Sequence, residues 1–452
     1  MPGKLSFSDK IGGKENLIIV DDQQAFQSVE GFGFALTGGS AQHLMGMTKE
    51  VRMQTLRQLF GREPGQAGIN FIRLTLGASD MNAFVFSYDD MPEGKEDFKL
   101  KHFSLAQDLK DVVPVMQEIL SIAPDITVMS SPWSAPAWMK ESKNVRGGKL
   151  RKECYDVYAE YFVKYVQAMK EKGITIHQLT IQNEPLNSRN TPSMPWSPQD
   201  EAEFIGKFLG PKLEAAGLDT KIILFDHNCD RPDYPLTTLL DHDADKYTHG
   251  IAYHHYAGDM SAMTYTHMVR PDKGIYFTEQ MTTERPGSPE IAIARSAKRL
   301  IVDIMRNWSR NVTLWNLAAD SLNDPHTDNG GCSMCQGAIT IDNGKLTSLN
   351  IAYYVVAQIA QFVPIGSVRI ASTAPDDPAL NLYEDEQNPG IFRLVHSPRA
   401  NVLPNVAFKT PDGKTVLLVV NDRAERSMVK IQYNGKYAMS ALEAGAVATY
   451  IW

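Results

Sequence analysis

Cysteine is scarce in this sequence, with four residues in a chain of 452. So few cysteines exclude the disulfide framework that stabilises small secreted domains. Cys332 and Cys335 form a C-x2-C pair with His326 nearby. A zinc site needs further ligands at matching spacing, and Cys154 and Cys229 are far away in the sequence. We therefore expect Cys332 and Cys335 to form either a disulfide or two free thiols.

Positive charge is not in excess either. The chain has 45 basic and 53 acidic residues, a net charge of −8, and 43% of its residues are hydrophobic. Without a basic surface, nucleic acids and anionic membrane surfaces are not expected partners. No apolar run approaches the roughly 18–20 residues of a membrane-spanning helix, so we expect no transmembrane segment.

The first residues, Met1-Pro2-Gly3-Lys4, also lack the apolar stretch of a signal peptide. The cysteine content is compatible with an oxidising or a reducing compartment. We expect a secreted or periplasmic protein, and a cytoplasmic location stays open.

Short, β-branched apolar runs alternate with helical stretches over most of the chain. This alternation is typical of a parallel α/β sheet. The apolar runs cover residues 31–36, 69–76, 126–131, 177–182, 221–225, 250–255, 274–279 and 312–317. The main helical stretches cover residues 49–60, 105–122, 155–172, 202–216 and 291–307. Eight such units over about 320 residues predict a (β/α)8 TIM barrel.

Beyond Gln361 the pattern changes to short strands separated by turns such as Asn434-Gly435. Such a pattern is typical of an antiparallel sandwich. The expected strands cover residues 366–371, 391–396, 415–420, 428–433 and 445–451, and segments 5–7 and 17–20 are expected to join them. We predict N-terminal sandwich strands in 1–28, a barrel in 29–362 and a β-sandwich in 363–452, with a structural rather than a sugar-binding role for the sandwich.

Two glutamates close apolar strands of the predicted barrel. Glu184 follows the fourth strand and Glu279 ends the seventh, so both are expected at the carboxyl-terminal face, where barrel enzymes carry their chemistry. Glycoside hydrolysis requires two carboxyl groups on one rim, one to protonate the leaving group and one to attack the anomeric carbon. The alternative is that either glutamate is a solvated loop residue, as most glutamates are.

Other strand residues complete a candidate site. Arg73 is a charge inside an apolar strand and needs a carboxylate partner, which we expect to be a barrel glutamate, in a structural ion pair or one that keeps the strand-seven carboxylate ionised. Trp133, Tyr256 and Trp315 lie at strand ends, where aromatic rings bind the apolar faces of sugars, although a single tryptophan is more often a core residue.

A metal centre is the rival interpretation of one segment. His254 and His255, together with His227, Asp226 and Asp259, offer metal-ligand side chains. Adjacent residues on a strand point to opposite faces, so only one of the two histidines can face the site. We therefore expect no catalytic metal and no cofactor.

The same segments resemble glycoside hydrolase family 30. The resemblance covers about residues 28–320 and is carried by Glu30-Gly31-Phe32-Gly33, Arg73, Ser131 to Lys140, Gln182-Asn183-Glu184-Pro185, His255-Tyr256, Glu279 and Trp315-Asn316-Leu317. The resemblance implies that Glu184 is the acid/base and Glu279 the nucleophile. It also implies that Asn183 contacts the 2-hydroxyl, that Trp133, Tyr256 and Trp315 line the −1 subsite, and that Arg73 and His255 belong to the substrate site. One departure is Gly38, where relatives often carry an acidic residue.

The resemblance further implies a retaining β-glycosidase that acts by double displacement on a carbohydrate substrate. Two carboxyl groups roughly 5–5.5 Å apart are expected for that mechanism. Members of this branch cleave β-1,6-glucan or glucosylceramide, and the absence of a lipid-anchoring helix favours endo-β-1,6-glucanase activity. Glucosylceramidase, β-xylanase or β-xylosidase activity are alternatives. An inactive carbohydrate-binding protein is another, against which the presence of Glu184, Glu279, Arg73 and Asn183 argues.

Overall fold

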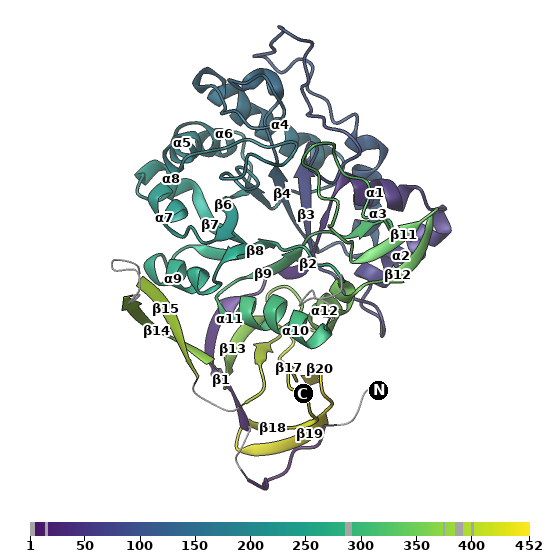
Figure 1. Cartoon of the computed structure of the whole chain (residues 1–452), viewed down its shortest axis with the longest axis vertical. Helices are drawn as coiled ribbons and strands as arrows, with labels where there is room; N and C mark the ends of the chain where they lie inside the picture. The colour runs from purple at the N-terminus through teal and green to yellow at the C-terminus, as the bar shows by residue number, and fades with distance from the viewer. Residues whose placement is uncertain (1–4, 14–16, 285–291, 374–375, 385–391, 399–401) are drawn as a thin grey trace.

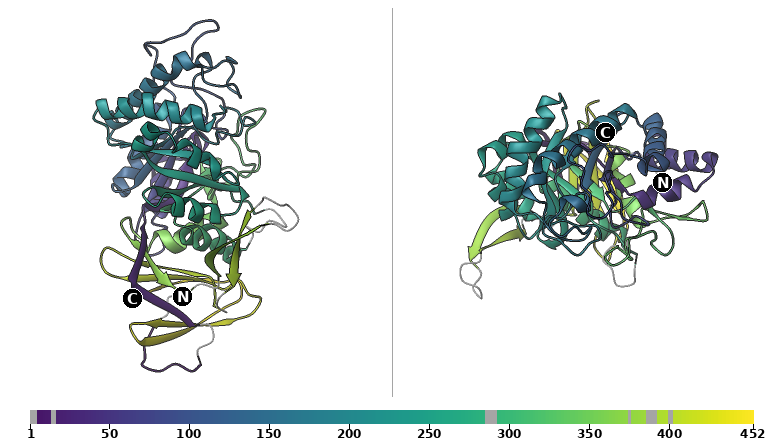
Figure 2. Two further views of the ribbon diagram at one scale, coloured as in Figure 1. Left: turned by 90° about the vertical axis from the view of Figure 1, so that its left-hand side faces the viewer. Right: turned by 90° about the horizontal axis from the view of Figure 1, so that it is seen from above.

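The computed structural model describes residues 5–13, 17–284, 292–373, 376–384, 392–398 and 402–452. A barrel and a β-sheet domain follow one another along the long axis of the molecule (Figure 1). The left view of Figure 2 shows the same stacking, with the yellow C-terminal strands and the purple strand near the N-terminus lying below the barrel. No helix among the described residues is long and apolar enough to cross a membrane.

The barrel is built from parallel strands that coincide with the apolar runs predicted from the sequence. Its sheet order, within the described residues, is β8-β7-β6-β5-β4-β3-β2-β9. Bridges from Ile275 to Ser309 and from Met281 to Trp315 bring β8 beside β9 and close the barrel. The strands are β2 (Gly31–Leu36), β3 (Phe71–Leu76), β4 (Thr127–Pro132), β5 (Gln178–Thr180), β6 (Lys221–Cys229), β7 (Thr248–Gly258), β8 (Gly274–Glu279) and β9 (Asn311–Leu314). The predicted TIM barrel is confirmed.

Helices cover the outside of this barrel (Figure 1). They are α1 (Gly38–Met45), α2 (Lys49–Phe60), α3 (Val112–Ile122), α4 (Tyr155–Glu171), α5 (Pro198–Phe204), α6 (Gly210–Ala215), α7 (Asp233–Thr238), α8 (His242–Tyr247), α9 (Ser261–Val269), α10 (Ile293–Ala297), α11 (Ile304–Arg306) and α12 (Ile351–Ala360). Two π-helical segments, Ile205–Leu209 and Lys298–Asp303, connect α5 to α6 and α10 to α11. Residue 291, the first of a predicted helix, lies outside the described residues.

The sequence explains where individual helices begin. The Thr48 hydroxyl accepts a hydrogen bond from the Val51 N–H at 3.4 Å and caps α2, whose start was predicted correctly. The helix predicted from residue 105 begins only at Val112, where the Asp111 side chain accepts the N–H of Val112. The segment before it forms a short 3-10 turn, Asp108–Lys110, and not part of the α-helix. In this turn the Asp108 carboxylate accepts a hydrogen bond from the Tyr88 hydroxyl.

The β-sheet domain has the strand order β19-β18-β1-β13-β16-β17-β20 within the described residues. Its strands are β1 (Leu17–Ser28), β13 (Val368–Ser372), β16 (Asn405–Lys409), β17 (Thr415–Val420), β18 (Ser427–Tyr433), β19 (Lys436–Leu442) and β20 (Val447–Ile451). The N-terminal β1 lies between β18 and β13, which confirms that this segment joins the C-terminal strands.

Some predicted and observed strands of this domain differ. Segment 5–7 is not a strand, and only Ser8 beyond it forms a bridge, to Tyr437. The strand expected at 391–396 largely coincides with β15 (Phe392–Pro398), which pairs with β14 (Asp376–Glu384) in a separate two-stranded sheet. Residue 391 lies outside the described residues. Strands β14, β16 and β19 were not predicted, and neither was the small sheet of β10 (Ala318–Ala319), β11 (Ile339–Asp342) and β12 (Lys345–Leu349).

The two domains share one hydrophobic core. Phe32 of β2 packs edge-on against Phe408 of β16, with ring centroids 6.4 Å apart. Strand β17 contributes to two cores, because its successive side chains point to opposite faces of the sheet. Val416 and Leu418 belong to the core shared with the barrel, and Leu417 belongs to a second core within the sheet domain. Every residue of β17 is buried. This packing ties the sheet domain to α10 and α12 of the barrel.

Candidate active site

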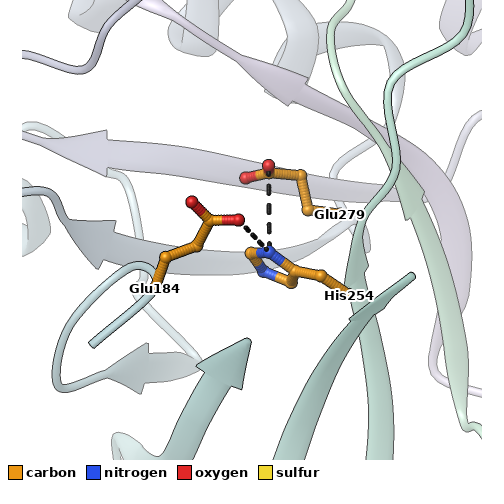
Figure 3. Close-up of side chains that lie close together, drawn as sticks. All are labelled: Glu184, His254 and Glu279. Carbon is orange, nitrogen blue, oxygen red and sulfur yellow. Dashed lines mark hydrogen bonds and ion pairs between the residues drawn. The ribbon is translucent and has the colours of Figure 1, made fainter. Parts of the chain in front are cut away.

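Glu184 and Glu279 lie together at the carboxyl-terminal ends of β5 and β8. One oxygen of each carboxylate and one ring nitrogen of His254 lie within 4.8 Å of one another, and Figure 3 shows the imidazole facing both carboxylates. Both glutamates are buried. Inverting glycosidases separate their carboxyl groups by about 6.5–9.5 Å to admit a water, whereas retaining enzymes hold them about 5–5.5 Å apart. The closer arrangement is the one that matches this pair.

Arg73 of β3 links the residues around the two glutamates. Its side chain is fully buried and donates to Glu279 Oε2 at 2.6 Å and to Asp226 Oδ2 at 2.7 Å. It also donates to Asn183 Oδ1 at 2.8 Å and to Ser131 Oγ at 3.2 Å. The sequence predicts one carboxylate partner for this buried charge. The structure gives it two, Glu279 at the end of the seventh barrel strand and Asp226.

Asp226 is the second partner, and we did not assign it to this site from the sequence. It accepts hydrogen bonds from Thr278 at 2.6 Å, Thr180 at 2.8 Å and Ser131 at 3.1 Å, in addition to Arg73. Burial alone would raise the pKa of Asp226, but the charge of Arg73, the hydrogen bond and charge of His254 and the Thr278 hydroxyl hold this pKa well below its ordinary value. Asp226 is therefore ionised.

A local distortion of β6 directs Asp226 into the barrel. Phe225 and Asp226 have φ angles of 77° and 54°, which non-glycine residues rarely adopt. The register of β6 against β7 shifts between Phe225 and His227, as in a β-bulge. The Phe225 N–H in this bulge donates to the buried Glu201 carboxylate at 3.3 Å. Unfavourable φ angles persist only where the surrounding contacts enforce them. Here they place the Asp226 carboxylate beneath the candidate site.

His254, not His255, faces the carboxylates. The His254 ring lies 3.2 Å from Glu184 Oε1 through Nδ1 and 3.0 Å from Asp226 Oδ1 through Nε2. The charged groups that act on the pKa of His255 are Arg299, Asp259 and Asp303, none of which belongs to the site. Successive residues of β7 point to opposite faces, and the position of the strand places His254 inward. His255, which the resemblance places in the substrate site, is thus not among the residues that the structure brings together around the two glutamates or along the cleft.

The aromatic residues predicted for the site differ in exposure. Trp133 and Trp315 are buried and tilted against each other with ring centroids 5.2 Å apart, and the Arg73 guanidinium lies 5.0 Å from the Trp133 ring. Tyr256 is 39% exposed, and its hydroxyl donates to Glu279 Oε1 at 3.1 Å while accepting the Met281 N–H at 2.9 Å. Tyr256 and Trp315 line the open cleft, whereas Trp133 lies beneath it.

The cleft above the glutamates has a volume of about 930 Å³. Besides the two glutamates, Tyr256 and Trp315, it is lined by Asp80, Met281, the turn 186–190, the loop 330–335, His227 and Asn228 at the end of β6, and Asp230 just after that strand. Cys332 and Cys335 in this loop form a disulfide, which decides between the two states expected for the pair. The buried Cys154 and Cys229 are free thiols.

Asp80 supplies an acidic group that we did not predict from the sequence. Burial, with the nearby charges of Glu279 and Glu184, raises the pKa of Asp80 well above its ordinary value. An acidic residue at Gly38 would require the buried Asn82 side chain to move, because a Cβ on Gly38 would lie 1.9 Å from Asn82 Nδ2. Asp80 follows β3, and the only signal for it was a polar stretch, Ser79-Asp80-Met81-Asn82, after an apolar strand.

The surroundings shift the pKa values of the two glutamates in opposite directions. Burial raises the pKa of Glu279 and outweighs the opposing charges of His254 and Arg73. Burial also acts on Glu184, but the hydrogen bond and the charge of His254 lower its pKa. Arg73 favours the ionised form of Glu279, as the sequence predicts, but the net shift of the Glu279 pKa is upward because burial is the larger effect.

Two carboxylates at this spacing, on the ends of the fourth and seventh strands of a parallel barrel, define a glycoside hydrolase of the retaining type. The model of the glycosyl hydrolase family 30 TIM-barrel domain matches residues 29–342, and that of the family 30 beta sandwich domain matches residues 366–450. The chain belongs to glycosyl hydrolase family 30.

The chain is similar to endo-1,6-beta-glucanases and to glucosylceramidases. The chain is 34% identical over 372 residues to the endo-1,6-beta-D-glucanase neg1 of Aspergillus fumigatus, covering 78% of this chain and 74% of the relative. It is 26% identical over 458 residues to the lysosomal acid glucosylceramidase of Mus musculus, covering 96% of this chain and 83% of the relative. The solved structure of the endo-beta1,6-glucanase BT3312 superposes with a TM-score of 0.85 at 29% identity, covering 99% and 94% of the two chains.

Proposed function

We propose that this protein is a retaining endo-β-1,6-glucanase in which Glu279 is the nucleophile and Glu184 the acid/base. The observation that carries the proposal is the approach of the two carboxylates to within 4.8 Å at the base of an open cleft. Glu279 attacks the anomeric carbon and Glu184 protonates the departing oxygen, after which Glu184 activates a water that releases the sugar. This assignment follows the strand positions of the two residues.

The neighbouring residues support binding of a sugar at the same place. Asn183 Oδ1 accepts from Arg73, so its amide N–H groups are the ones left to donate to a bound hydroxyl. The exposed ring of Tyr256 and the cleft-lining Trp315 offer aromatic faces to a pyranose ring. Asp80 offers a carboxyl group to further hydroxyls.

The cleft favours a polysaccharide over a lipid. The wall of the cleft includes many polar side chains: Asn187, Ser188, Arg189, Asn190, Asn228, Asp230 and Ser333. Leu186 and Met334 are the exposed apolar residues of that wall, with exposed fractions of 41% and 36%. The two chains of a ceramide need a continuous apolar surface, whereas glucan hydroxyls pair with polar groups. Glucosylceramidase activity is the second candidate and is supported by the mouse relative.

A substrate panel tests this proposal. We expect internal cleavage of β-1,6-linked gluco-oligosaccharides, with fragments of intermediate length appearing first. Glucosylceramide in detergent micelles and xylo-oligosaccharides are the competing substrates, and Glu279→Gln is the matched inactive control. Faster hydrolysis of glucosylceramide would contradict the proposal, and inactivity of the wild type on the whole panel would indicate a binding protein.

We also propose the domain limits 1–28, 29–362 and 363–452 and a secreted or periplasmic location. The limits are supported by the end of β1 at Ser28 and by the segment between α12 and β13, which runs from residue 361 to 367. The location is supported by the Cys332–Cys335 disulfide, because disulfides persist mainly in oxidising compartments. Thiol alkylation of protein taken directly from its source would test the location, since a reduced pair there would contradict it.

A further inference from the structure

Asp226 determines which nitrogen of the His254 ring always carries a hydrogen. The imidazole is fully buried, and its Nε2 lies 3.0 Å from Asp226 Oδ1. Asp226 is an ionised carboxylate that receives donors from Arg73 and from three hydroxyl groups, and an ionised carboxylate only accepts. Nε2 must therefore carry a hydrogen, whatever the charge of the ring.

The other ring nitrogen then shares one proton with Glu184. Nδ1 lies 3.2 Å from Glu184 Oε1. A bare Nδ1 and a carboxylate oxygen are both acceptors, so this contact requires a proton between them. The second oxygen of Glu184, Oε2, accepts the amide N–H of Asn187 at 2.7 Å. One proton thus belongs jointly to Nδ1 and Oε1, and it can lie on either atom.

We propose that His254 is a positioning residue that holds, in the resting enzyme, the proton that Glu184 delivers to the leaving group. The proposal rests on the function proposed above. It gives the Asp226–His254 pair a role in that reaction, which is to store the proton that Glu184 transfers. Glu184 is then a carboxylate at rest, held between the His254 imidazolium and the Asn187 amide.

The proton balance of both steps follows. In the first step the Nδ1 proton passes to Glu184 and from there to the glycosidic oxygen, the C1–O bond to the leaving sugar breaks, and a C1–O bond to Glu279 forms. His254 is left neutral with its hydrogen on Nε2. In the second step a water attacks C1, Glu184 takes the water proton and returns it to Nδ1, and the bond to Glu279 breaks. No other reactant is needed.

The charges around the ring favour a proton on His254 in the free enzyme. Glu279 Oε1 lies 3.8 Å from Nδ1, and Asp226 and Glu184 contact the two nitrogens. Arg73 of β3 and His227 of β6 are the nearby basic groups, and Tyr256 lies beside the ring with centroids 6.2 Å apart. Burial opposes the charged ring, but the carboxylates raise the pKa of His254 to about 9. The same arrangement explains why the pKa of Glu184 is lowered rather than raised.

Nitrogen NMR of the wild-type protein labelled with ¹⁵N-histidine tests the resting state. At pH 7 we expect both His254 nitrogens to be protonated, with the signals assigned by their loss in His254→Gln. After Glu279 is trapped with 2-deoxy-2-fluoro-gentiobiosyl fluoride, the negative charge beside Nδ1 is gone and the midpoint of the His254 titration should fall. A neutral ring at pH 7 in the free enzyme, or a midpoint unchanged in the adduct, would overturn the proposal. Failure to form the adduct would instead count against Glu279 as nucleophile.

The pH profile of His254→Gln shows whether His254 stores the proton for Glu184 or only stabilises the fold. A proton shared by two sites is bound more tightly than by either site alone. The basic limb of kcat/KM on a β-1,6-glucan oligomer should therefore move down by one pH unit or more, while a dinitrophenyl glucoside, which needs little proton assistance, loses less activity. His255→Gln is the matched control and should leave the profile unchanged. An equal loss on both substrates with an unmoved limb would mean that His254 only supports the fold.

Discussion

Glu184 and Glu279 have different tasks, so their removal should have different effects. Glu279→Ala forms no covalent intermediate, and added azide should restore turnover by attacking C1 directly, giving a product of opposite anomeric configuration. Glu184→Ala should lose about 10²–10⁴-fold on natural glucans but much less in the glycosylation step with activated aryl glucosides. Steady-state and burst kinetics on both substrate types measure these effects. Equal losses in both variants on both substrates would show that the assignment is wrong.

The pKa shifts of the site predict the limits of activity with pH. Glu279 must be ionised to attack, and burial raises its pKa, so the acid limb of kcat/KM should lie above the ordinary glutamate value of 4.5. The shared proton is lost only as the pH approaches the His254 pKa of about 9, so activity should persist through neutral pH. Rate measurements on a β-1,6-glucan oligomer between pH 4 and 10 give both limbs. An acid limb at or below 4.5 would contradict the burial argument.

Single residues of the site were predictable only where a strand pattern exposed them. Glu184 and Glu279 follow apolar runs, and Arg73 interrupts one, so each stands out in the sequence. The choice between His254 and His255 depends on the phase of β7, which two adjacent histidines do not reveal. Asp226 could not be assigned, because its inward direction depends on the β-bulge at Phe225 and Asp226, and nothing in the local sequence indicates those φ angles.

Among the loops, the one closed by Cys332–Cys335 forms part of the cleft wall. Cys335 packs with Trp133 and Trp315, and its sulfur lies 3.8 Å from Met281 Sδ. Replacing both cysteines by serine should loosen this wall and lower kcat/KM on a β-1,6-linked tetrasaccharide by about tenfold, or about 1.4 kcal/mol of transition-state binding. An aryl glucoside occupies fewer sugar positions beside this wall, so it should be affected much less.

Reduction provides the control for that prediction. A mild dithiol should reproduce the loss in the wild type and have no further effect on the double variant, because Cys154 and Cys229 form no disulfide. If the tetrasaccharide and the aryl glucoside lose activity equally in oxidised and reduced protein, the loop does not contribute to the substrate wall.

Strands were predictable where both faces are buried. All residues of β17 are buried, and its Val-Leu-Leu-Val-Val run was recognised at the observed limits. Strand β19 was missed because its Lys-Tyr-Ala-Met-Ser-Ala-Leu sequence is half exposed and lacks a clear alternation. The turn before it was recognised, since Asn434 and Gly435 adopt φ angles of 48° and 74° and fit a two-residue hairpin, but the strand predicted after that turn, 445–451, is β20, and β19 between them was not predicted.

The shared core predicts that barrel and sheet domain unfold together. Phe408 is completely buried against Phe32, and Arg306 of α11 donates to the backbone carbonyls of Asn405 and Ser372. Phe408→Ala should destabilise the whole protein by about 3–5 kcal/mol. Calorimetry should show one transition at a lower Tm rather than two. A separate early transition, with the barrel transition unmoved, would show that the sheet domain folds independently.

The anomeric form of the first product tests the central claim most directly. The close approach of Glu184 and Glu279 and the polar cleft together predict cleavage of β-1,6-linked glucan with retention. Proton NMR recorded during hydrolysis of a β-1,6-linked gluco-oligosaccharide should show the β-anomer of the new reducing end first, with the α-anomer appearing later by mutarotation. Initial appearance of the α-anomer would contradict the double-displacement mechanism, and absence of any cleavage would contradict the substrate.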